Sequence, residues 1–208
     1  MATDTRTRIL DASAALLARQ GYNATGVKQI VTEAKAPFGS VYHHFPGGKQ
    51  EIGAAAVVIS GKLYEQLIPA VFDNTPDLPT GVRWFFNGAA QHLVETDFAD
   101  ACPIATVALE TASTSEQMRE ACAAVFNSWI AAGSEMQQTR GGLSPESARR
   151  LTIAMIAALE GAFVLARAQR SVEPLEVAGE LVAEAAEREQ SLGQRAVSRA
   201  PASDETSG

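Results

Sequence analysis

The apolar residues of this chain recur every three or four positions almost from end to end, which is the spacing of amphipathic helices. No run of alternating β-branched residues is long enough to predict a strand. A first helix is expected at about 4–20, with Gly21 after it as a C-cap. Its apolar stripe consists of Ile9, Ala12, Leu16 and Leu17. The pattern therefore predicts an all-α fold.

Two short helices are predicted next, at about 27–34 and 38–44, and Lys35-Ala36-Pro37 separates them. Pro46-Gly47-Gly48 ends the second one before a long helix that begins near Lys49. Two short helices joined by a tight break are typical of a helix-turn-helix that reads DNA. From spacing alone, ordinary helix packing is the commoner explanation of this pattern, so both interpretations stay open at this point.

Breaker residues divide the rest of the chain into long helices. Pro69 and the segment 74–79 separate two of them, and Pro103 opens a short one. Ser115 and Ser144 are predicted N-caps. The last helix is expected to start at Glu173-Pro174, and the end of the chain is small and polar. We therefore predict a small head domain at 1–48 that contains the two short helices, a helical body at 49–190, and a disordered tail at 191–208.

Charge is unevenly distributed between these parts. The net charge is −7, yet residues 1–50 carry six basic and three acidic side chains, a balance of +3. A mildly basic head on an acidic body suits a protein that contacts phosphate at one end only. The chain has no uncharged apolar stretch of about 18 residues and starts without an apolar leader, so we expect a cytoplasmic protein without a membrane partner.

Several residues of the head are candidates for contact with DNA. Val41 and Phe45, four positions apart, are expected to pin the second short helix from behind. Phe38, Gly39 and Ser40 would then face base edges, and the remaining candidates would contact phosphate. Thr25 is predicted to cap the first short helix, and Lys49 lies where the dipole of the long helix favours an anion. The phosphate candidates are Thr25, Lys28, Tyr42, His43 and Lys49.

These residues resemble the DNA-binding domain of the tetracycline-repressor (TetR) family over 24–52. The matching residues are Thr25, Val27, Ile30, Ala34, Gly39, Ser40, Val41, Tyr42, His44, Phe45 and Lys49. The resemblance implies an all-helical homodimer, usually a repressor that a small molecule releases from DNA. It also implies that residues 1–48 are the helix-turn-helix DNA-binding domain and residues 49–190 the ligand-binding and dimerisation domain. The sequence departs from the family pattern at Lys35, where the family often has Gly, and at Phe38, where it has a polar or basic residue. A Lys in a left-handed turn costs about 1 kcal/mol.

Two further features resemble one branch of this family, the group with lincomycin-resistance and flavonoid-responsive repressors. His44-Phe45-Pro46-Gly47-Gly48-Lys49 has one residue more than the usual spacing between Phe and Lys. The second feature is the run Cys102-Pro103-Ile104-Ala105, with Ala108-Leu109-Glu110 after it. The implied function is a ligand-responsive regulator of a resistance, efflux or catabolic gene, bound to a near-palindromic operator.

Aromatic, sulfur-containing and polar residues of the middle helices are candidates for an effector pocket, because such pockets are mostly apolar with a few polar groups. For each residue alone, a place in the core is the commoner explanation; Glu110 could equally be solvated at a helix end, and His92 could be an ordinary surface or core histidine. The candidates are Trp84, Phe85, His92, Cys102, Thr106, Glu110, Phe126, Trp129 and Met155.

The last two helices are rich in Ala and Leu at spacings of three and four, which favours a four-helix bundle between two subunits. The alternative is that one such face packs on the subunit's own core. The candidate interface residues are Leu151, Leu159, Ala162, Phe163, Ala166, Ala178, Leu181 and Val182.

Other classes of protein find little support in the sequence. There is no nucleophile elbow, no zinc-protease motif and no P-loop, so we expect no enzyme and no cofactor. Two cysteines, Cys102 and Cys122, and three histidines do not form a metal motif, and two buried reduced thiols are favoured over a disulfide. A helical adaptor that binds another protein through its head remains as an alternative.

Overall fold

The computed structural model describes residues 4–199, and this part of the chain is helical throughout, with no strand. The expectation of an all-α fold is confirmed. The helices are α1 (Thr5–Gln20), α2 (Val27–Glu33), α3 (Phe38–His44), α4 (Gly48–Glu65), α5 (Leu67–Phe72), α6 (Leu78–Glu95), α7 (Pro103–Thr111), α8 (Glu116–Gly141), α9 (Pro145–Gln169) and α10 (Glu173–Arg199).

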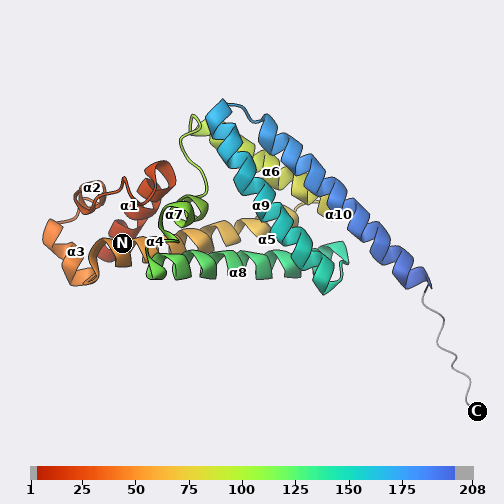
Figure 1. Ribbon diagram of the computed structural model, residues 1–208, viewed down its shortest axis with the longest axis horizontal. Helices are drawn as coiled ribbons and strands as arrows, with labels where there is room; N and C mark the ends of the chain where they lie inside the picture. The colour runs from red at the N-terminus through yellow and green to blue at the C-terminus, as the bar shows by residue number, and fades with distance from the viewer. Residues whose placement is uncertain (1–3, 200–208) are drawn as a thin grey trace, which may run out of the picture.

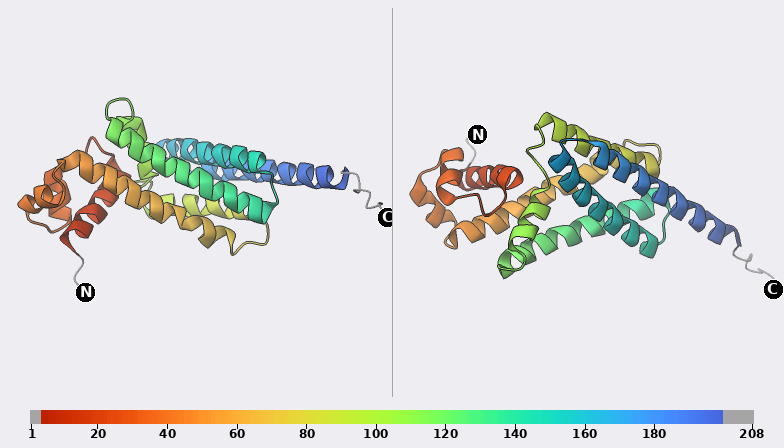
Figure 2. Two further views of the ribbon diagram at one scale, coloured as in Figure 1. Left: turned by 90° about the horizontal axis from the view of Figure 1, so that it is seen from below. Right: turned by 45° about the horizontal axis from the view of Figure 1, so that its top comes forward.

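The molecule has a small head and an elongated body, joined through α4 (Figure 1). The helices α1, α2 and α3 form the head at one end, and α4 runs from there into the body. Within the body α8 packs along α4 and α9, and α10 packs between α6 and α9 (Figure 2). The short helix α7 lies between the two parts and contacts α1, α4 and α8.

Three clusters of buried side chains hold this arrangement together. The head cluster joins α1, α2 and α3 and includes Val41, Phe45 and Ile52. A middle cluster around Met118 packs α7 and α8 on α4, and a body cluster around Phe86 joins α6, α9 and α10. Burial of apolar side chains is the main force for folding. Each cluster therefore fixes the relative position of the helices that contribute to it.

The helix ends follow the capping residues in the sequence. The side chains of Ser115 and Ser144 accept hydrogen bonds from Met118 N (3.3 Å) and Ser147 N (3.2 Å), so both predicted N-caps are confirmed. Gly21 ends α1 with φ +77° and its N–H bonds to Leu17 O. A positive φ at this position strongly favours glycine. Local chemistry thus sets where α8 and α9 begin and where α1 ends.

The predicted tail needs correction, whereas the predicted domain boundary coincides with a helix start. The helix α10 continues through Ser191 to Arg199, so the tail predicted at 191–208 begins inside a helix; residues 200–208 lie outside the described part. The proposed domain boundary after residue 48 falls at the start of α4, and Ile52 on its first turns belongs to the head cluster. Because α4 contributes to the head and the middle clusters, it connects the two parts.

Two segments, Gly48–Phe72 and Pro145–Gln169, are long and apolar enough to pass a simple test for membrane spans. Both carry core residues of the fold, such as Val57 on the first and Met155 on the second. Core helices of soluble proteins commonly have this composition, so the test is weak evidence for a membrane.

Candidate functional site

The helix α3 has one buried and one exposed side. Val41 and Phe45 are completely buried, as the spacing predicts, whereas Phe38 and Tyr42 are 53% and 55% exposed. The rings of Phe38 and Tyr42 contact edge to face, with centroids 6.1 Å apart. Gly39 and His43 are also exposed, and no side chain surrounds Gly39. The helix therefore presents an open face on which another molecule can lie.

The turn between α2 and α3 has the left-handed residue that the sequence suggested. Lys35 has φ +49°, and Ala36 N after it donates to Val31 O at 2.9 Å. Arg8 Nη1 donates to Lys35 O at 3.4 Å. A non-glycine residue in this conformation costs about 1 kcal/mol, which the packing of both helices on the head cluster offsets.

The additional glycine before α4 has a clear structural role. Gly48 has φ +62° and its N–H donates to Phe45 O at 2.9 Å, which closes a tight turn directly behind α3. Gly47 N donates to the Glu51 carboxylate at 2.8 Å. The left-handed conformation favours glycine at residue 48, so this residue makes the tight turn that joins α3 to α4.

The capping role predicted for Thr25 is wrong. Its hydroxyl donates to Gly21 O at 2.6 Å, its side chain is buried, and the N-cap of α2 is Gly26. The hydroxyl is turned back into the connector between α1 and α2, because bonding there satisfies a buried carbonyl. Lys28 on the first turn of α2 is exposed and remains a candidate for contact with phosphate.

Glu110, predicted as an effector residue, connects α7 to the head and is absent from the lining of the groove between α7, α8 and α9. Its Oε2 accepts hydrogen bonds from Tyr22 N (2.6 Å) and Asn23 N (2.8 Å), the amides of the α1–α2 connector. Gly21 lies so close that a Cβ atom there would overlap this carboxylate. Charge-assisted bonds of this kind are stronger than neutral ones. The C-terminal end of α7 is thereby fixed to the head.

Lys49 is part of the same link. Its Nζ lies 4.3 Å from the centroid of the Tyr22 ring. Burial lowers the pKa of Lys49, and the negative charge of Glu110 partly opposes this effect. Burial also raises the pKa of Tyr22. A role of Lys49 in phosphate binding remains a prediction, and its position against Tyr22 gives it a second role in holding α4 to the connector.

An apolar groove of about 610 Å³ lies between α7, α8 and α9. Of the predicted effector residues, Cys102, Thr106 and Phe126 line it, and they come from the first two of these helices. The third helix contributes apolar side chains and one residue that the prediction missed, Glu160. Both cysteines are free and buried, as expected, and burial raises the pKa of the Cys102 thiol, which therefore stays protonated.

Glu160 could have been found as the single charged residue within the apolar stretch 151–166. Burial raises its pKa to about 7, an effect that the Cys102 thiol partly opposes. Arg167, which also lines the groove, donates to Phe98 O (3.2 Å) and Ala99 O (3.0 Å) and so holds the loop before α7. The groove is thus apolar, with one carboxyl group on its wall.

The other predicted effector residues lie elsewhere. Trp84 and His92 are exposed on α6, which packs against α10 and is absent from the groove lining. Phe85 and Met155 pack in the body cluster. Trp129 donates from Nε1 to Gly61 O at 2.8 Å and packs on Phe126 behind the groove. These corrections have one cause: helical spacing identifies apolar faces but does not say which partner covers each face.

Most of the predicted interface residues belong to the subunit's own core. The buried members are Leu151, Ala162, Phe163, Ala166 and Val182, and Leu159 and Ala178 pack against the same cluster. Leu181 is 59% exposed. Leu165 on α9 and Val177 on α10 are exposed apolar residues that the prediction did not include. The alternative that one face packs internally therefore holds for most of the set.

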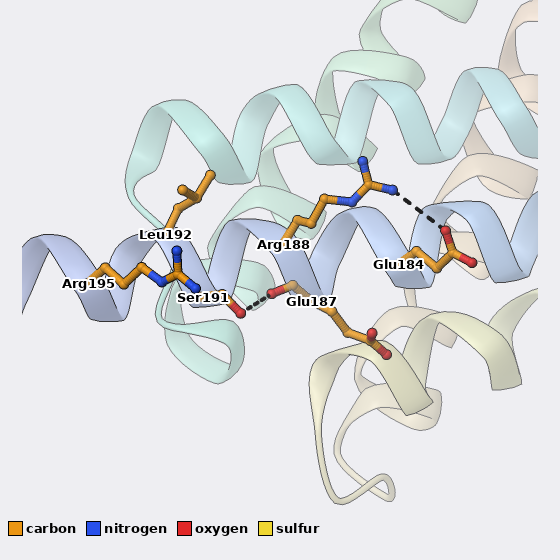
Figure 3. A pocket seen from close by; sticks show the side chains of 6 residues that line it. All are labelled: Glu184, Glu187, Arg188, Ser191, Leu192 and Arg195. Carbon is orange, nitrogen blue, oxygen red and sulfur yellow. Dashed lines mark hydrogen bonds and ion pairs between the residues drawn. The ribbon is translucent and has the colours of Figure 1, made fainter.

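A second surface hollow runs along α10 and is unlike the apolar groove. All six residues that line it come from this one helix, and charged side chains predominate (Figure 3). Arg188 pairs with Glu184 at 3.6 Å, and the Ser191 hydroxyl donates to Glu187 O at 2.9 Å. Because all the residues that line this hollow lie on one helix, it is open to solvent. It is therefore a poor candidate for an effector site.

An exposed reading helix on a compact head, carried by a helical body with an apolar groove, defines a transcriptional regulator with a helix-turn-helix. Comparison with known families gives the same class. Residues 9–56 match the model of "Bacterial regulatory proteins, tetR family". Residues 80–181 match that of the "Transcriptional regulator LmrA/YxaF-like, C-terminal domain". The chain belongs to the TetR family, whose members are regulators and not enzymes.

Individual relatives agree with this assignment. The chain is 36% identical to the uncharacterized HTH-type transcriptional regulator YxaF of Bacillus subtilis (strain 168) over 83% of its own length and 90% of that protein. It is 32% identical to the HTH-type transcriptional regulator LmrA of the same organism over 83% of its own length and 91% of that protein. The fold matches the regulatory protein TetR from Rhodobacter sphaeroides with a TM-score of 0.75, at 23% identity, over 86% and 97% of the two chains. The resemblance to the TetR family is thus confirmed.

Proposed function

We propose that this regulator is a cytoplasmic homodimer that represses a resistance, efflux or catabolic gene and that a small molecule releases from its near-palindromic operator. One observation carries the proposal: α7 contributes Cys102 and Thr106 to the apolar groove, and Glu110 at its other end holds the head. A ligand that favours a different position of α7 would therefore also favour a different position of the reading helix. Its effect is limited by its differential affinity for the two states.

DNA binding is tested with a mobility shift on the DNA that flanks the protein's own gene. A two-fold dimer requires two half-sites about one helical turn apart or somewhat more. We expect retardation of one upstream fragment, weakened by added salt, because phosphate contacts release counterions. Absence of any salt-sensitive retardation would contradict the proposal.

Tyr42→Phe is expected to weaken binding about three- to tenfold on every DNA sequence alike, because it removes a single hydrogen bond to phosphate. Because Tyr42 is exposed, the substitution should leave the stability of the fold unchanged. Tyr64→Phe is the matched control, since it removes the same hydroxyl from the body. A loss confined to one base position would show that Tyr42 reads sequence instead.

Leu181→Glu is expected to convert the dimer to monomers, because a charge would enter an apolar interface without a partner. The exposed residues Leu165, Val177 and Leu181 on α9 and α10 are the proposed contact. Sedimentation velocity measures the change, and operator binding should be lost with it. Val94→Glu, at an exposed apolar position on α6, is the control and should leave the dimer intact. An unchanged dimer in Leu181→Glu would exclude this face.

A further inference from the structure

The groove between α7, α8 and α9 has an unusual electrostatic composition. Its lining is apolar apart from Cys102, Thr106, Glu160 and Arg167. The guanidinium of Arg167 is engaged by two carbonyl oxygens of the loop before α7. Glu160 forms no ion pair with any residue that the structure describes, and the neighbouring Cys102 thiol is only a weak donor. The acceptor capacity of its carboxyl group is therefore largely unused.

A carboxylate in apolar surroundings is costly unless a cation or strong donor compensates it. Burial raises the pKa of the Glu160 carboxyl group to about 7, the direction that this cost predicts. A positively charged ligand group would remove the cost, because it would supply the missing partner within the groove. The apolar walls would at the same time bind an apolar ligand body.

We propose that the effector is an apolar amine, bound with its ammonium group against Glu160 and its apolar part against Phe126, Ile130 and Ile156. This inference rests on the proposed function, because it specifies the ligand of the same groove. It follows from charge complementarity between one half-buried carboxyl group on the groove wall and a ligand cation. A neutral alcohol of the same shape would leave the carboxylate without its counter-charge.

The other ionisable groups near Glu160 do not compete with it near neutral pH. Tyr64 on α4 has its pKa raised by burial to about 12, and Cys102 at the start of α7 has its pKa raised as well. Arg167 on α9 is a permanent cation, and α8 contributes only Phe126 and Ile130 to the groove. Protonation of Glu160 is thus the change that should affect ligand binding between about pH 6 and 8.

The test compares naphthylmethylamine with naphthylmethanol by isothermal titration calorimetry on the full chain. We expect the amine to bind at least tenfold more tightly at about pH 8, the ratio that a charge-assisted hydrogen bond supplies. From about pH 6 to pH 8 its affinity should rise about tenfold, because the ionised fraction of Glu160 rises by that factor while the amine stays protonated. The affinity of the alcohol should change less than threefold.

Glu160→Gln keeps the shape of the side chain and removes its charge. It should reduce amine affinity at about pH 8 at least tenfold, to the level of the alcohol, and abolish the pH dependence. Glu135→Gln is the matched control, because Glu135 lines a different groove along α8. If Glu160→Gln does not fold, the pH dependence of amine affinity in the unmodified protein still tests the proposal.

Equal affinities of amine and alcohol, binding of the alcohol alone, or no binding of either would overturn the proposal. Operator binding, measured separately by mobility shift, keeps the two proposals apart. A protein that binds the operator but does not prefer the amine refutes only the ligand assignment. A protein that prefers the amine but binds no operator refutes only the proposed function.

Discussion

Phe45→Ala is expected to destabilise the head by about 3–5 kcal/mol and to abolish operator binding, because it creates a cavity under the reading helix. Phe45 is fully buried at the end of α3, in one cluster with Val41 and Ile52. Its own N–H bonds to Val41 O at 2.7 Å. Loss of the ring therefore removes the packing that fixes α3 on the head cluster. The exposed face of α3 would then no longer be held in a single orientation.

The two tryptophans make this effect measurable. Trp84 and Trp129 both lie in the body, so urea unfolding followed by tryptophan fluorescence reports on the body alone. Hydrogen exchange at the amides of α3 reports on the head. We expect faster exchange in the head of Phe45→Ala and a smaller shift, if any, of the fluorescence transition.

Phe38→Ala is the matched control for this prediction. It makes the same chemical change on the same helix, but Phe38 is 53% exposed, so stability should change by less than about 0.5 kcal/mol. Its effect should be confined to DNA binding, where a contact with a thymine methyl would be lost. Equal losses of stability in both variants would show that burial of Phe45 does not hold α3.

Glu110→Ala is expected to cost about 2–4 kcal/mol and to weaken operator binding at least tenfold. This loss of stability corresponds to two hydrogen bonds to a charged acceptor. Their contribution is smaller than for buried bonds, because both are partly exposed to solvent. The amides of Tyr22 and Asn23 would lose their partner, and the α1–α2 connector would no longer be tied to α7. Urea unfolding and a mobility shift measure the two effects.

Two further variants make the Glu110 prediction specific. Glu110→Gln keeps one acceptor oxygen and should have a smaller effect than Glu110→Ala. Glu116→Ala removes an exposed carboxylate on the next helix, where it pairs with Arg119 at 2.5 Å, and it should leave the stability nearly unchanged. An operator affinity within threefold of the unmodified protein in Glu110→Ala would contradict a link between α7 and the head.

The reading helix could be predicted in detail because its signals are local. The break at Lys35, the pinning pair Val41 and Phe45, and the glycine turn before α4 each depend on residues only a few positions apart. The structure confirms the left-handed Lys35 and the buried pair. Thr25 was misassigned because a hydroxyl before a helix can bond forward to an amide or back to a carbonyl, and the sequence does not distinguish the two.

The groove and the interface could be predicted only in part. The pattern of α9 predicts Phe163 in the subunit interface, whereas the structure has it in the body core, where it also lines the groove. Met155 was placed in the pocket and packs in the same core. Both residues lie on apolar faces of α9, and an apolar face is compatible with a core, a ligand or a second subunit.

The sequence by itself determined the all-α class, the place of most helices and the class of protein, since these depend on periodicity, on breaker residues and on a local motif. Only the tertiary structure decided the role of Glu110 and Glu160. Glu110 meets the connector 88 positions away in the chain, and Glu160 meets Cys102 across two helices. Such contacts depend on how helices pack, and helix packing is set by the complementarity of whole faces rather than by any one residue.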